Sequence, residues 1–432
     1  MKIKKFFSQE VIKVFSLNAI ASFVKMVTGF INIKVVAYLI GPAGIALLGQ
    51  LNNFTNIVLA WSSGGINGGI TKYIAQFSES PKKVNVYIKT SIWIVSVLSI
   101  FCCAILILGS DYFSLLILKN TKYQSVFKIF GVSIILYSLN NLLISILNGY
   151  KEYKQFIKVN IAGSIIGAIF TVILTYFFSL YGALLAAITY QSIVFFVTLF
   201  LCRNAIWMKK SKLIGRFSFL AAKNLGKYSI MALVSSIVVP LSQILIRNLI
   251  IKYNSLQTAG IWEGINRISA MYLMVITTSL SVYYLPRLSE LLGSFEIKKE
   301  IIKLYKIFLP FLIITNLLIY IIREYIVMVL FSNEFSGMKD YFSFQLLGDF
   351  FKIGSFLLAY LMIAKAMMNT YIITEVVFSF SYILLSYIAI QKYGGIGATV
   401  GYAVNYFIYW LVMILLFRKI LFGSSNENII SR

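Results

Sequence analysis

The sequence predicts an all-α membrane protein of about twelve transmembrane helices, arranged as two six-helix lobes. Of its 432 residues, 59% are hydrophobic and 12% are charged, and the mean hydropathy is +0.86. So few polar side chains could not cover a water-soluble protein of this size, whereas a bilayer requires an apolar outer surface. The apolar residues also form separate stretches, each long enough to cross a bilayer as a helix.

The apolar stretches take up nearly the whole chain, because one helical crossing needs about 20 residues. The predicted spans are 11–38, 44–77, 84–109, 125–148, 155–178, 182–202, 220–251, 257–285, 301–322, 341–364, 369–390 and 395–417. Glycines at 64, 65, 68 and 69, Pro240 and Pro286 predict bends in the second, seventh and eighth spans. No room is left for a catalytic domain outside the membrane.

The two halves of the chain resemble each other. Ala43-Gly44-Ile45 matches Ala259-Gly260-Ile261, and Tyr181-Gly182, Ala186 and Tyr190 match Tyr393-Gly394, Ala398 and Tyr402. Six spans in each half predict lobes of the same orientation, related by a pseudo-twofold axis along the membrane normal. We expect an N-terminal lobe at 1–208, a cytoplasmic interlobe loop at 209–219, a C-terminal lobe at 220–420 and a cytoplasmic tail at 421–432. This architecture favours an alternating-access transporter, although a duplicated fold with another role remains open.

Lysine and arginine are concentrated in alternate connections, which predicts the orientation. They are frequent before the first span, at 203–227 and at 287–306, whereas the opposite side carries Lys119, Lys122, Lys252, Arg323, Lys339 and Lys392. Basic loops stay on the cytoplasmic side, so both termini are expected in the cytoplasm. The net charge of +25 is then mostly a topological signal, and no nucleic-acid partner is needed to explain it.

The composition excludes several kinds of chemistry. The chain has no histidine, which removes histidine-based acid–base and nucleophilic catalysis and imidazole metal sites. Cys102, Cys103 and Cys202 lack metal-site spacing, and no phosphate-binding G-x-x-x-x-G-K-[ST] motif occurs. We therefore expect no enzyme activity, no cofactor and no metal. Transport energy would come from an ion gradient, the substrate's own gradient or a partner protein.

Charged residues inside the predicted spans are the candidate site. A charge at the centre of a membrane helix costs roughly 2.5 to 3.5 kcal/mol and usually faces a cavity or a partner. Candidate cations for an anionic headgroup are Lys25, Arg247, Arg267 and Lys352, in a net-positive central cavity. Candidates for ion coupling or charge pairing are Asp349, Glu375 and Glu263. The Glu263/Arg267 and Asp349/Lys352 pairs could instead only hold helices together, whereas Lys25 and Arg247 have no carboxylate within one turn.

Several longer stretches of the sequence are specific enough to indicate a family. They lie at 41–50, 64–76, 259–269, 281–291, 332–354 and 359–366. They resemble the Wzx-type lipid-linked oligosaccharide flippases of the multidrug/oligosaccharidyl-lipid/polysaccharide (MOP) exporter superfamily, and the resemblance runs from about residue 17 to 417. It implies transport of an undecaprenyl-pyrophosphate-linked O-antigen or enterobacterial common antigen unit from the cytoplasmic to the periplasmic leaflet of the bacterial inner membrane. A glycan polymerase and a chain-length regulator are possible partners. Lys34 and Lys365 also match the family pattern, whereas Glu263 and Arg267 depart from the common antigen type.

Two rival functions remain open at this stage. An ion-coupled drug exporter of the same superfamily should have an acidic, aromatic site, and the excess of cations argues against it. A membrane-embedded glycan polymerase typically carries a large periplasmic loop, whereas the longest outer connections here are short and contain no histidine. Several tyrosines could stack on sugars or form interfacial belts, among them Tyr272, Tyr283, Tyr284, Tyr341, Tyr360 and Tyr371.

Overall fold

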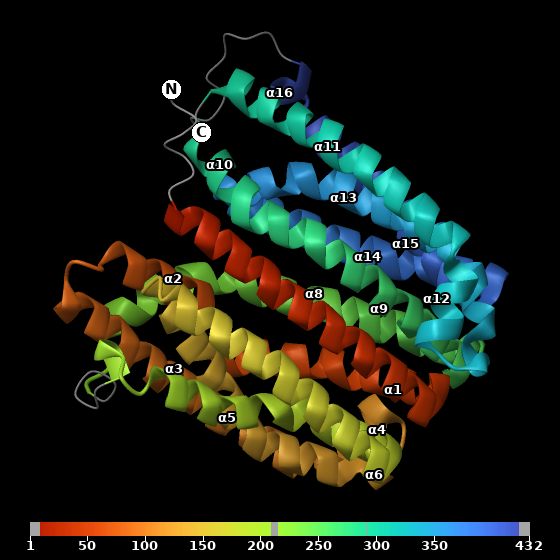
Figure 1. Cartoon of the computed structure of the whole chain (residues 1–432), viewed down its shortest axis with the longest axis horizontal. Coiled ribbons are helices and arrows are strands. Elements are labelled where there is room, and N and C mark those ends of the chain that lie inside the picture. Colours follow the sequence, from red (N-terminus) through yellow and green to blue (C-terminus); the bar gives the residue numbers. More distant parts are fainter. Residues whose placement is uncertain (1–8, 209–214, 292, 423–432) are drawn as a thin grey trace. The chain divides into compact units, whose positions relative to one another are not determined.

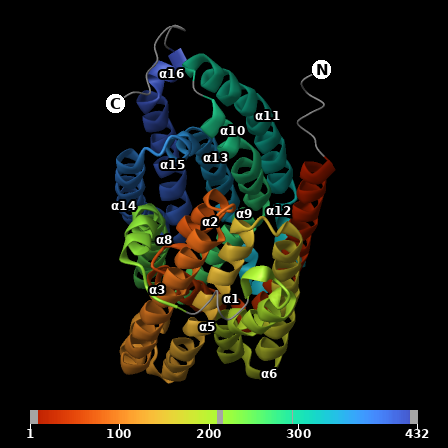
Figure 2. The same cartoon turned by 90° about the vertical axis from the view of Figure 1, so that its left-hand side faces the viewer.

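The computed structural model describes residues 9–208, 215–291 and 293–422, and every regular element within them is a helix (Figures 1 and 2). It contains 8 described segments that are long and apolar enough to cross a membrane. Three of these, 20–63, 153–202 and 368–416, are 44 to 50 residues long, so each can cross twice. Together with the apolar helix α9 (Leu256–Ser279) they give the predicted twelve-helix architecture.

The chain divides into two compact units. The first comprises residues 1–40 and 47–241. Its described elements are most of α1 (Gln9–Ser63), α2 (Asn67–Gln76), α3 (Pro81–Leu108), α4 (Ser110–Leu118), η1 (Thr121–Tyr123), α5 (Gln124–Gly149), α6 (Tyr153–Cys202), η2 (Ile206–Met208) and the first part of α8 (Phe219–Tyr253). Helix α5 packs against α2, α3 and α6. Ile70, Ile88 and Leu225 belong to its buried core.

The second unit comprises residues 41–46 and 242–432. Its described elements are the second part of α8, α9, the π-helical turn η3 (Leu280–Tyr284), α10 (Leu285–Glu290), α11 (Ser294–Ile321), α12 (Arg323–Leu330), η4 (Asn333–Tyr341), α13 (Phe342–Ala364), α14 (Met368–Tyr393), η5 (Gly394–Ile396), α15 (Gly397–Leu416) and α16 (Arg418–Phe422). Helix α13 packs against α11 and α15, and α15 packs against α14. The loop and tail predicted at 209–219 and 421–432 lie partly outside the described residues, so the predicted domain limits stay a prediction.

The glycine bend of the second span is found, α8 continues as one helix through Pro240, and two details differ from the prediction. Gly64 and Gly65 adopt φ of +60° and +64° and separate α1 from α2, so the stretch 44–77 is two helices and not one. The eighth span was expected to end at Pro286, but helical structure continues through α10 to Glu290. Proline is tolerated there because it occupies the first turn of α10, where its missing N–H is not needed.

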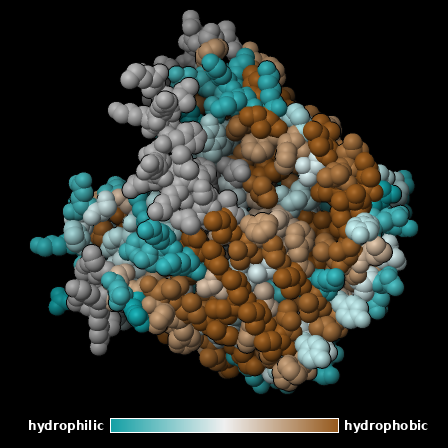
Figure 3. All heavy atoms as spheres, viewed as in Figure 1, coloured by the Kyte–Doolittle hydropathy of each residue, from teal (hydrophilic) through white to brown (hydrophobic). Residues whose placement is uncertain are grey.

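Apolar side chains cover wide continuous areas of the surface, as Figure 3 shows for one face. Trp93, Phe177 and Phe200 are among the large hydrophobic residues that are more than half exposed. Such areas far exceed the apolar patches of soluble monomers. This surface is therefore the lipid-facing surface that the composition predicts.

The backbone also shows the internal repeat of the two halves. It aligns one pair of segments differently from the sequence match at Tyr181-Gly182. Ser179 bends α6 with φ of 48° and ψ of −131°, and Gly394 bends the chain between α14 and α15 with φ of 62° and ψ of −146°. Shortly after each bend a glycine, Gly182 or Gly397, packs against a carbonyl eight residues earlier. Gly182 therefore corresponds to Gly397. The alignment of Tyr181-Gly182 with Tyr393-Gly394 was wrong, because it matched residue types and not bends.

Ser179→Gly is expected to stabilise the first unit. This backbone conformation is essentially confined to glycine, and the equivalent position in the second unit is Gly394. Relief of strain, less the entropy cost of glycine, should raise the free energy of unfolding by on the order of 1 kcal/mol. The measurement is thermal unfolding in detergent. Gly394→Ala is the matched control and should lower stability, and a lower midpoint for Ser179→Gly would contradict the assignment of strain.

Candidate functional site

A buried carboxylate, Asp349, lies in the middle of α13. Its side chain is completely inaccessible to solvent. Ser269 Oγ donates to Asp349 Oδ2 at 2.5 Å, Tyr272 donates to the same oxygen, and Tyr402 donates to Oδ1 at 2.7 Å. Gln345 Nε2 lies 3.5 Å from Oδ1. Hydroxyl donors from α9 and α15 thus surround a carboxylate on α13, which offsets part of the cost of burying it.

Lys352 lies one turn after Asp349 and packs among aromatic rings. Its Nζ is 5.3 Å from the ring centroid of Tyr406, 5.6 Å from that of Tyr402 and 5.7 Å from that of Phe356. These distances permit cation–π interactions. The predicted Asp349/Lys352 ion pair is not found among the described ion pairs. The Asp349 oxygens are engaged by hydroxyl groups, and the ammonium is held by the rings.

Glu375 on α14 belongs to the same region. It is partly buried, and the charges of both Glu375 and Asp349 act on Lys352. Fully ionised, these residues would carry one positive and two negative charges.

A second charged cluster joins α8 to α9. Arg247 is 1% exposed, and it forms an ion pair with Glu263. The other oxygen of Glu263 accepts from Arg267 Nε at 3.2 Å, as the i,i+4 spacing predicts. The Arg247 guanidinium also lies 5.4 Å from the Trp262 ring. Arg247 has no carboxylate within one turn of its own helix, and its partner Glu263 comes from the next helix.

The structure places the predicted residues in three groups. Arg247, Glu263 and Arg267 form one, and Asp349, Lys352 and Glu375 form another, both in the second unit. Lys25 lies on α1 in the first unit, where its side chain is exposed. The sequence reasoning missed Ser269, Tyr402 and Tyr406, and it considered Tyr272 only as a sugar-stacking or belt residue.

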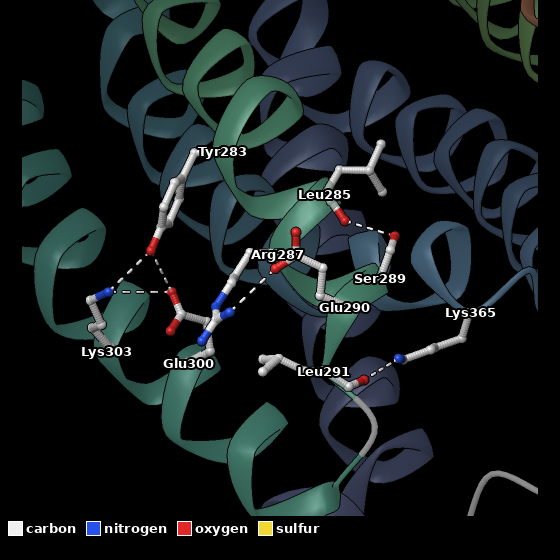
Figure 4. A network of polar contacts seen from close by, with 9 residues as sticks. All are labelled: Tyr283, Leu285, Arg287, Ser289, Glu290, Leu291, Glu300, Lys303 and Lys365. Atoms are coloured by element: carbon white, nitrogen blue, oxygen red, sulfur yellow. Dashed lines mark hydrogen bonds and ion pairs between the residues drawn. The ribbon is translucent and has the colours of Figure 1, made fainter. Parts of the chain in front are cut away.

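A further polar network lies at one end of the second unit (Figure 4). Tyr283 donates to Glu300 Oε1 at 3.1 Å, and Lys303 Nζ lies 3.2 Å from Tyr283 and 3.4 Å from Glu300. Lys365 follows α13 and donates to the Leu291 carbonyl. Partial burial lowers the pKa of the Lys365 ammonium from its usual value. These contacts connect η3, α10, α11 and the end of α13, so Lys365 has a structural contact of its own.

Comparison with known proteins places the chain among polysaccharide exporters. Residues 11–292 match the family model described as polysaccharide biosynthesis protein. The chain is 30% identical over 411 residues to the lipid III flippases of Escherichia coli (strain K12) and Shigella flexneri, covering 93% of this chain and 97% of each relative.

Solved structures show the same fold at low identity. An inward-facing multidrug resistance MATE family transporter of the MOP superfamily superposes with a TM-score of 0.77 at 12% identity, covering 93% of this chain and 98% of that one. A MOP superfamily transporter from Pyrococcus furiosus gives 0.65 at 12% identity, covering 93% and 96%. The chain therefore belongs to the Wzx-type polysaccharide biosynthesis protein family and is a multi-pass membrane transporter with the MOP superfamily fold, not an enzyme.

Proposed function

We propose that this protein is a flippase that moves undecaprenyl-pyrophosphate-linked oligosaccharide repeat units of the O-antigen type across the bacterial inner membrane by alternating access. The observation that carries the proposal is the similarity to lipid III flippases over 93% of the chain. A headgroup with sugars and pyrophosphate cannot cross hydrocarbon unaided, whereas a polyprenyl tail is stable in it. The tail stays in lipid while the headgroup passes along the protein.

The cations of the candidate site bind the headgroup in this proposal. Arg267 and Lys352 are partly accessible on the second unit, and Lys25 is exposed on the first. A guanidinium can hold a pyrophosphate through two hydrogen bonds, and an ammonium attracts it as a point charge. Arg247 is almost fully buried against Glu263 and Trp262, so its role is to fix the carboxylate that orients Arg267.

The orientation follows from the basic connections. Both termini and the basic loops are on the cytoplasmic side, where headgroups are assembled, and the second-unit network around Lys303 and Lys365 then lies at the cytoplasmic end. A cysteine placed before residue 9 should be protected from membrane-impermeant thiol reagents in intact cells. The chain's own Cys102, Cys103 and Cys202 are replaced by serine for this measurement.

The test of the function is the fate of the glycan in a strain that lacks this protein. Loss of a flippase leaves undecaprenyl-linked repeat units in the cytoplasmic leaflet, whereas loss of a polymerase leaves single capped units outside the cell. Loss of a drug exporter changes neither pool and only lowers resistance to the drug. Repeat units accessible to a periplasmic glycosidase in the deletion strain would overturn the proposal.

Lys25→Ala is expected to reduce surface glycan several-fold at an unchanged amount of membrane-inserted protein. The exposed ammonium is not part of the described packing, so its loss removes an attraction for pyrophosphate without opening the core. Glycan display is measured by gel electrophoresis at matched protein levels. Lys122→Ala removes an exposed lysine that lies outside the predicted spans and should have no effect. Equal display from the two variants would contradict the role of Lys25.

A further inference from the structure

A groove on the first unit is not used by the proposed transport site. It has a volume of about 540 Å³ and lies between α5 and the second half of α6. Its walls are apolar side chains that project from the two helices, namely Ile129, Val132 and Leu136 on one side and Ile193 and Phe196 on the other. Val132 is 62% exposed and Phe196 is 59% exposed. The groove therefore opens on the surface that faces lipid.

The hydroxyl groups beside the groove are already used by the protein. Ser133 Oγ donates to the carbonyl of Ile188 at 3.0 Å, and Ser192 Oγ donates to the carbonyl of Ser133 at 2.7 Å. Thr189 bonds to the carbonyl of Leu185 in its own helix. A ligand in the groove would find no free hydroxyl, so the groove is suited to a hydrocarbon chain.

The length of the groove along α5 is close to the thickness of one leaflet of the hydrocarbon core. It runs along α5 from Lys128 to Leu136, which at 1.5 Å per residue is about 12 Å. Half of the hydrocarbon core is about 15 Å thick. Lys128 lies about 6 Å from the start of α5, near the end of the span predicted at 125–148.

Lys128 supplies a charge at one end of this apolar groove. Its side chain is exposed, and its Nζ lies 3.2 Å from Gln124 Oε1, an uncharged acceptor one turn earlier. Lys119 and Lys122 lie in the preceding connection, where Asp111 is the single acidic residue between 109 and 124. This end of the unit is positively charged, which fits a phosphate.

We propose that this groove binds one acyl chain of an anionic membrane phospholipid and that Lys128 holds the lipid phosphate. The apolar walls suit an acyl chain, and the positive charge at one end of the groove suits the phosphate of an anionic phospholipid. The lipid bridges α5 and the second half of α6 along the groove, so it stabilises the first unit by binding the folded state alone.

The test is native mass spectrometry of the full-length protein titrated with phosphatidylglycerol and, separately, with phosphatidylcholine. Lys128→Gln should weaken binding of phosphatidylglycerol about fivefold and that of phosphatidylcholine by a smaller factor, because the choline ammonium already balances the phosphate of that lipid. Lys154→Gln removes an exposed lysine of the same unit that neither lines the groove nor belongs to its charged end, and it should have no effect. Equal losses from the two variants, or no loss from either, would overturn the proposal.

Two further variants test the groove itself. Val132→Trp and Ile193→Trp place a large ring in it from α5 and from α6, and both positions are exposed enough to accept one without repacking the core. Each should abolish binding of phosphatidylglycerol in the titration. Each should also abolish the increase in melting temperature that the bound lipid gives to the wild-type protein. If either folded variant retains the lipid, the groove is not the site. If undecaprenyl phosphate displaces phosphatidylglycerol from the wild type at equal concentration, the assigned occupant is wrong.

Discussion

Glu263→Ala is expected to lower the free energy of unfolding by about 3 to 5 kcal/mol, because it leaves the buried Arg247 guanidinium without its carboxylate partner. Arg247 is 1% exposed, so water cannot replace the lost interaction. Thermal unfolding in detergent, followed by tryptophan fluorescence, should show a large decrease in the midpoint. Transport should fall further than the loss of folded protein, because Arg267 also loses the carboxylate that orients it.

Arg267→Ala is the matched control for this prediction. It removes the more exposed partner of the same carboxylate, a pair of i,i+4 residues on one helix, and such pairs contribute well under about 1 kcal/mol. Exchanging both partners in Arg247→Met/Glu263→Leu should recover most of the stability lost in Glu263→Ala, because the buried guanidinium is removed together with its carboxylate, whereas the remaining Arg267 still reaches solvent. Equal destabilisation by Glu263→Ala and Arg267→Ala would show that the contact of Glu263 with Arg247 contributes no more to the free energy of unfolding than its contact with Arg267.

The fold could be predicted from the sequence because a bilayer imposes strong rules on composition. Backbone groups in hydrocarbon must bond within their own helix, so each apolar stretch could be identified as a span without knowledge of its neighbours. The bend at Gly64 and Gly65 was predicted from the glycines, and the bend at Gly41 falls in the gap between the first two predicted spans. The bend at Ser179 was anticipated by the gap between two spans, although serine gives no sign of the positive φ found there.

The partners of the charged residues were less predictable, because they come from other helices. Arg247 and Glu263 lie at similar distances from the turn between α8 and α9, and that symmetry was the available signal for their pairing. No comparable signal links Asp349 to Tyr402, which lies more than one complete helix later. The i,i+4 spacing predicted the contact of Arg267 with Glu263 correctly. The i,i+3 spacing predicted a contact of Lys352 with Asp349 that is not found, because hydroxyl groups from other helices bind Asp349 and aromatic rings surround Lys352.

Coupling to an ion is the role that the surroundings of Asp349 favour if the protein is a flippase. With no histidine in the chain, a proton-driven step has to use a carboxylate, and a carboxylate in a low-dielectric interior can exchange protons with modest changes in its surroundings. Asp349 has three hydroxyl donors from two other helices. A change in its protonation would therefore alter the hydrogen bonds that join α13 to α9 and α15.

Asp349→Asn is expected to abolish the dependence of flipping on a pH gradient in proteoliposomes while leaving the protein folded. Asparagine has the same shape, its carbonyl can accept two of the hydroxyl bonds, and a rotated hydroxyl can accept from its amide. It cannot exchange a proton, so the rate with a gradient should equal the rate without one. Asp340→Asn, which changes an exposed carboxylate in η4, should retain the wild-type response. If Asp349→Asn also retains it while Glu375→Gln loses it, the coupling group is Glu375, and Asp349 only holds α13 against α9 and α15.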